Sequence, residues 1–169
     1  MITLPALLAI PILGGLLILE TSILNQIPLL QGTADLVLLA LIAWALQKRV
    51  SSAWSWGIIG GLLVGYVSAV PLMVYLVSYL AAVGFSLLLR QRLWNVPLLS
   101  MLLATFISTL FMHVLIMLTM RLSDTPLAFA ATVNLVTLPS LLLNMILAIP
   151  FFVVLGDLAK LLQPEALEM

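Results

Sequence analysis

Residues 53–89 have the sequence AWSWGIIGGLLVGYVSAVPLMVYLVSYLAAVGFSLLL, which contains no charged residue. A membrane-spanning helix needs about 20 apolar residues, so this stretch is too long for one helix. Pro71 divides it, because the residue before a proline is pushed away from helical backbone angles. The stretch therefore predicts two consecutive membrane spans, at 53–69 and 71–89.

The composition of the whole chain agrees with this prediction. The 169 residues are 64% hydrophobic and 7% charged, with a net charge of zero, whereas soluble domains carry about 25% charged residues. The polar side chains are too few to cover a water-facing surface, which excludes a soluble enzyme, and a disordered chain needs low hydrophobicity. No nucleic-acid partner is expected, because six cations cannot build a basic patch.

Charges and turn residues divide the rest of the chain into four further apolar runs. We therefore expect one all-α integral membrane domain over residues 1–169, with six transmembrane helices at 4–24, 34–47, 53–69, 71–89, 96–120 and 132–155. The first run lacks the basic start of a cleaved signal peptide and is expected to be retained. The second run, about 21 Å long as a helix, is short for a bilayer. It either begins in the preceding loop or lies where the bilayer is thin.

The cations predict the orientation. Five of the six follow the second, fourth and sixth spans, on the same side as the N-terminus: Lys48, Arg49, Arg90, Arg92 and Lys160. Flanking cations mark the cytoplasmic side, so both termini are predicted to be cytoplasmic, with Arg121 outside. All four tryptophans lie near the cytoplasmic breaks, as expected for rings at the membrane interface: Trp44, Trp54, Trp56 and Trp94.

Small residues recur every four positions along the third span, at Gly57, Gly61, Gly65 and Ala69. Such a stripe lies on one helix face and lets two helix backbones approach closely in lipid. Two interpretations remain open. The stripe either packs a neighbouring helix of the same chain or docks the helix of a partner protein.

Three anions and one cation are predicted at the outer face: Glu20, Asp35, Asp124 and Arg121. Asp35 begins the second span, where a carboxylate caps the backbone N–H groups of a helix and favours its dipole. Glu20 lies at the outer end of the first span, where the dipole disfavours an anion. We therefore expect Arg121 to pair with Glu20 within an outer polar cluster.

Polar residues and prolines mark the last two spans. His113 is expected to be neutral and hydrogen-bonded to a neighbouring helix, and Asn134, Asn144, Thr105, Ser108 and Thr109 are expected to form interhelical hydrogen bonds. Ser140 and Asn144 share one face. Pro139 and Pro150 should kink the last span and free carbonyls that neighbours must satisfy, which shapes either a packed bend or a cavity or partner surface. The sequence shows no catalytic set, metal-ligand spacing or cofactor motif, so we expect no enzyme activity.

Three groups of residues resemble the MreD family of the bacterial rod-shape system. The first is Pro28 followed by Ala34-Asp35-Leu36, similar to the "PDL" helix of that family. The second is the glycine-rich 60–65 followed by Ser68-Ala69-Val70-Pro71-Leu72. The third is Leu138-Pro139-Ser140 through Asn144, with Ala148-Ile149-Pro150. One departure is Gly65, where many members carry an aspartate, so no role of that carboxylate is carried over.

This resemblance implies a non-enzymatic scaffold in the bacterial inner (plasma) membrane. The family binds the single-span protein MreC and, through it, the actin-like MreB and the RodA–class B penicillin-binding protein synthase, which links it to peptidoglycan synthesis and cell shape. Its fold is similar to the substrate-binding subunits of energy-coupling-factor vitamin transporters. A small-molecule-binding transporter subunit is therefore the alternative, and a lipid-handling protein is a third possibility. We expect the glycine stripe or the last span (Pro139, Ser140, Asn144, Pro150) to dock the MreC transmembrane helix.

Overall fold

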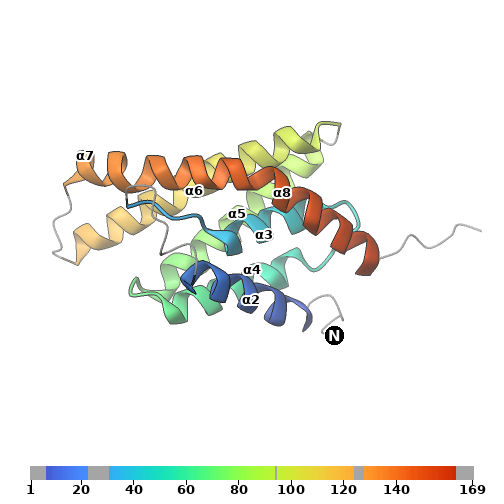
Figure 1. Cartoon of the computed structure of the whole chain (residues 1–169), viewed down its shortest axis with the longest axis horizontal. Coiled ribbons are helices and arrows are strands. Elements are labelled where there is room, and N and C mark those ends of the chain that lie inside the picture. Colours follow the sequence, from blue (N-terminus) through green and yellow to red (C-terminus); the bar gives the residue numbers. More distant parts are fainter. Residues whose placement is uncertain (1–6, 23–30, 94, 124–127, 163–169) are drawn as a thin grey trace, which may run out of the picture.

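The computed structural model describes residues 7–22, 31–93, 95–123 and 128–162. Its helices follow one another as α2 (Ala9–Ser22), α3 (Leu36–Leu46), α4 (Ala53–Val67), α5 (Leu72–Arg92), α6 (Pro97–Leu122), α7 (Phe129–Thr132), the π-helix η2 (Val133–Thr137) and α8 (Leu138–Leu162). The last three form one continuous run, Phe129–Leu162. The all-helical fold is confirmed, with a helical segment at each of the six predicted positions (Figure 1).

The helices differ in length. Three are long and apolar enough to cross a membrane: α5, α6 and the Phe129–Leu162 run. The other three, α2, α3 and α4, are shorter apolar helices. With 11 residues, α3 advances about 16 Å, roughly half the thickness of a bilayer core. Within the described residues, three of the six predicted spans are therefore long enough to cross a membrane and three are shorter.

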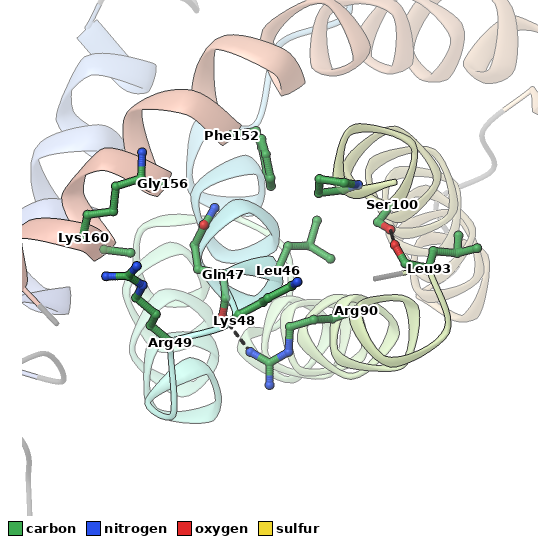
Figure 2. Close-up of a pocket in the computed structure, with 12 residues that line it drawn as sticks. Leu46, Gln47, Lys48, Arg49, Arg90, Leu93, Ser100, Phe152, Gly156 and Lys160 are labelled. Carbon is green, nitrogen blue, oxygen red and sulfur yellow. Dashed lines mark hydrogen bonds between the residues drawn. The ribbon is translucent and has the colours of Figure 1, made fainter. Parts of the chain in front are cut away.

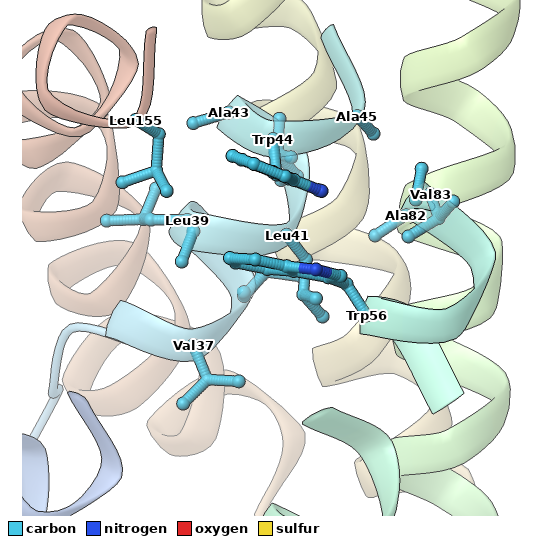
Figure 3. Close-up of a cluster of buried hydrophobic side chains, with 14 of the residues drawn as sticks. Val37, Leu39, Leu41, Ala43, Trp44, Ala45, Trp56, Ala82, Val83 and Leu155 are labelled. Atoms are coloured by element: carbon cyan, nitrogen blue, oxygen red, sulfur yellow. The ribbon is translucent and has the colours of Figure 1, made fainter. Parts of the chain in front are cut away.

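The 11-residue helix α3 forms the centre of the molecule. Every residue from Leu36 to Leu46 is buried, and α3 contacts α2, α4, α5, α6 and α8. A helix that is apolar on all sides is stable when other elements surround it completely. Figure 3 shows Leu39 and Leu41 of α3 between Leu155 of α8 and Val83 of α5. Protein rather than lipid therefore covers this helix.

Two tryptophans pack against each other in the core, where α3 ends and α4 begins (Figure 3). The rings of Trp44 and Trp56 stack with centroids 4.2 Å apart and planes 13° apart, and both side chains are fully buried. Trp44 Nε1 donates to Ser52 Oγ at 3.3 Å. Both rings therefore contact protein rather than lipid, and their predicted place at the membrane interface stays a prediction. Trp54 is half exposed, and the side chain of Trp94 lies outside the described residues.

The glycine stripe of α4 packs on α5. A Cβ at Gly61 would lie 2.8 Å from Leu76 Cα, and one at Gly65 would lie 3.0 Å from Leu72 Cα. At Gly57 the nearest atom is Val83 Cγ2 at 3.1 Å. This supports the interpretation of packing within the chain and contradicts a partner-docking stripe, because α5 occupies the face. The last member, Ala69, lies exposed in the α4–α5 turn.

We predict that Gly61→Ala destabilises the protein by about 1–3 kcal/mol, because a new methyl group would force two backbones apart. Thermal unfolding in detergent measures the change. Gly15→Ala is the matched control, since nothing lies within 4 Å of a Cβ built there. Equal unfolding temperatures for the two variants would show that the α4–α5 contact is looser than the structure indicates.

Candidate functional site

The site begins at the proline near the start of α8. Pro139 has no N–H group, so the carbonyl of Leu135, four residues earlier, receives no helical hydrogen bond from it. Gln31 N donates to that carbonyl at 3.0 Å. The π-helix η2 directly precedes the proline, and wide π turns often occur at functional sites. The prediction that a proline of the last span would free a carbonyl for a neighbouring segment is confirmed at Pro139.

The 31–35 segment continues along α8 from this point. Thr33 N donates to Ser140 Oγ at 3.1 Å, and Asp35 N donates to Asn144 Oδ1 at 2.9 Å. Four residues of extended chain advance about 13 Å, and the nine residues of helix from Leu135 to Asn144 advance about the same distance. Alternate N–H groups of the segment therefore find acceptors on one face of α8. The predicted shared face of Ser140 and Asn144 is confirmed.

A glycine permits this close approach. A Cβ at Gly32 would lie 2.6 Å from Ser140 N and 2.7 Å from Pro139 Cβ. The helix itself begins only at Leu36, after this non-helical segment, so the second span does not begin in the preceding loop as a helix.

Asp35 caps α3 as predicted. Its Oδ1 accepts a hydrogen bond from Leu38 N at 2.7 Å, and its Oδ2 accepts one from Tyr79 Oη at 2.8 Å. The residue is buried. Both bonds favour the carboxylate, and so does the positive end of the helix dipole.

Glu20 binds the same helix end. Its Oε2 accepts from Leu36 N at 3.0 Å, so the first turn of α3 is held by two carboxylates. The expected partner, Arg121, is exposed at the end of α6, and the described residues include no ion pair between it and Glu20. That pairing is wrong because backbone donors satisfy Glu20 instead. Asp124 and Pro28 lie outside the described residues.

Asn144 carries the network into α6. Its Nδ2 donates to Thr109 Oγ1 at 3.1 Å, which confirms this interhelical bond. His113 Nδ1 lies 2.9 Å from Thr109 O, so its partner is on its own helix rather than on a neighbour. The hydroxyls of Thr105 and Ser108 are buried without a hydrogen-bond partner, and Asn134 is exposed. The interhelical bonds predicted for these three are not formed.

A cavity of about 540 Å³ adjoins this network. Its polar lining comes from several helices and the 31–35 segment: Glu20, Gln31, Thr33, Asp35, Tyr75, His113, Thr132, Ser140 and Asn144. Three methionines, Met112, Met117 and Met120, line it as well. Within the described ranges, no three His, Cys, Asp or Glu residues gather to hold a metal ion. The cavity therefore offers hydrogen bonds and adaptable apolar contacts to a small molecule.

Comparisons of the chain with protein-family models, with curated proteins and with solved structures found no match.

We predict that Asn144→Leu lowers the free energy of unfolding by about 1–3 kcal/mol, because Asp35 N–H and the Thr109 hydroxyl would lose a buried partner. Chemical or thermal unfolding in detergent measures the loss. Asn134→Leu removes an exposed amide from the same helical run and should be nearly neutral. An unchanged free energy of unfolding in Asn144→Leu would show that the hydrogen bonds from Asn144 to Asp35 and Thr109 do not stabilise the fold.

Proposed function

We propose that this chain is a MreD-like, non-enzymatic scaffold of the bacterial inner membrane, acting in cell elongation and regulating peptidoglycan synthesis and cell shape. One observation carries the proposal. Two of the separate motifs on which the resemblance rests meet in the fold, where Asp35 N donates to Asn144 Oδ1. Residues 109 positions apart in the chain are thus held together, as are Thr33 and Ser140, which are 107 positions apart. The two motifs therefore belong together physically, because their residues hydrogen-bond to each other in the folded chain.

The polar groups at the start of α3 hold helices together and are not arranged for catalysis. The carboxylates among them accept hydrogen bonds from N–H groups of α3 and from Tyr79. A nucleophile would need a base within reach and room for a reacting atom, whereas these groups are committed to positioning α3. A rigid core of this kind supports a binding surface on the outside of the helices, which suits a scaffold.

The partner helix is proposed to dock on the outward face of α8. Of the docking residues expected on the last span, Pro139, Ser140 and Asn144 are buried, whereas Pro150 is exposed. Around it lie the exposed apolar side chains Ile146 and Val153. Figure 1 shows the run changing direction along α8, and a bend presents a shaped surface to a neighbouring helix.

The chain contains no cysteine, so disulfide mapping tests this directly. We expect MreC to be retained when the two proteins are purified together in detergent. Cysteines at Ile146 and Val153 should cross-link to cysteines in the MreC transmembrane helix, and a cysteine at Phe106, exposed on α6, should not. Loss of MreC in purification would overturn the scaffold proposal. Retention with cross-links only at Phe106 would overturn the docking face alone.

The cavity of about 540 Å³ favours one second candidate, a small-molecule-binding transporter subunit. Helices and the 31–35 segment supply its polar groups. This candidate predicts that the purified protein releases one tightly bound small molecule on denaturation, detected by mass spectrometry. His113→Phe should reduce its amount, and Arg121→Gln, which is outside the cavity lining, should not. Retained MreC without any stoichiometric small molecule favours the scaffold.

A further inference from the structure

A second cavity lies at the opposite end of α3. Its volume is about 240 Å³. Four cations from three separate segments line it (Figure 2): Lys48, Arg49, Arg90 and Lys160. Among the described residues that line it, none is acidic. The chain has six Lys and Arg residues in all, so most of its positive charge gathers around one small volume.

Arg90 builds one wall of this cavity. Its Nη1 donates to the carbonyls of Ala45 at 3.1 Å, Gln47 at 2.8 Å and Val50 at 3.2 Å. A cation at this position satisfies carbonyls at the C-terminal end of α3 and offsets the negative end of its dipole. The loop that carries Lys48 and Arg49 is thereby held against the cavity, so their placement is a product of the fold.

The start of α6 adds further positive potential. Pro97 and Ser100 of its first turn line the cavity. Within the described part of the chain, no side chain caps this turn. The positive end of the α6 dipole therefore faces the same volume as the cations, and helix starts of this kind bind anions.

Among the described residues, Asp157 of α8 is an anion close to this cation cluster, and it is already paired. Asp157 Oδ1 lies 2.8 Å from Lys160 Nζ, and both side chains are about two-thirds exposed, at 64% and 67%. An exposed pair of this kind holds its partner weakly. Lys160 can therefore turn toward an anion inside the cavity at little cost.

We propose that this basic cavity binds a phosphate group. The shared chemistry is a phosphate oxyanion, supplied either by the headgroup of an anionic phospholipid or by free phosphate. Leu46, Leu93 and Phe152 give the cavity an apolar side, which suits the glycerol and first methylenes of a lipid. Basic pockets between membrane helices recognise such headgroups. The proposal rests on this cavity alone and holds whichever function above is correct.

The test is thermal unfolding of the purified chain in neutral detergent, titrated with phosphatidylglycerol, phosphatidylcholine or inorganic phosphate. We expect phosphatidylglycerol to raise the unfolding temperature and phosphatidylcholine to leave it unchanged. Lys48→Gln and Arg49→Gln should each raise the half-saturating concentration about fivefold. Arg92→Gln is the matched control, because it removes one charge from the last turn of α5 without touching the cavity lining, and its shift should be below about twofold.

The same titrations also distinguish a lipid headgroup from free phosphate as the source of the phosphate group. Stabilisation by phosphatidylglycerol but not by inorganic phosphate identifies the lipid headgroup, and stabilisation by inorganic phosphate at similar concentrations identifies the free ion. Equal effects of both lipids, no effect of any anion, or equal shifts in Arg92→Gln and Arg49→Gln would overturn the proposal.

Discussion

The backbone N–H groups just before and at the start of α3 must find acceptors away from water, and the rest of the structure depends on how they do so. An unsatisfied amide in an apolar environment costs several kcal/mol. Leu135, Ser140 and Asn144 of the last helical run supply three acceptors. Glu20 and Asp35 supply the acceptors for the first turn. Non-helical chain is thereby tolerated inside the bundle, and α3 can be short.

A short, enclosed helix also explains why the two cavities differ in charge. The N-terminal end of α3 carries a partial positive charge and attracts Glu20 and Asp35, which line one cavity. Its C-terminal end carries a partial negative charge and binds Arg90, which lines the other. The net charge of zero therefore hides a separation of charge along one buried helix.

Sequence patterns predicted what depends on neighbours along the chain. Runs of apolar residues placed the six helical segments, and Asp35 before an apolar run predicted the cap that is present. The gathering of Lys48, Arg90 and Lys160 at one cavity agrees with their predicted common side. The free carbonyl before Pro139 was also recognisable, because the missing N–H is a local property.

Features that depend on where a side chain or a helix face points in the folded chain could not be predicted. Arg121 was expected to pair with Glu20 because charged side chains can be found in the sequence. The backbone N–H donors at the start of a helix cannot be recognised there as partners of a distant side chain. Trp44 and Trp56 lie near a basic break and nevertheless turn inward, because two helix ends face each other there. The glycine stripe showed that a backbone would approach, yet the identity of that backbone, α5, follows only from the turn between α4 and α5.

The place of the motif residues in the fold limits what a family resemblance can mean. Asp35, Pro139, Ser140 and Asn144 are buried and face other parts of the same chain, so they specify how α3 is held against α8. Chains that share these residues would share that packing first, and function belongs to sites carried on a fold. Specificity for a partner or ligand must therefore come from residues other than these four. Such residues include Ile146 and Val153 on the outward face of α8, the lining of the basic cavity, and non-motif residues of the larger cavity such as Tyr75 and His113. These surfaces differ in what they can select. An apolar helix face in lipid selects by shape and close packing, whereas the cavities select by charge and hydrogen bonding. A partner helix and a phosphate group can therefore bind the same molecule without competing for one surface.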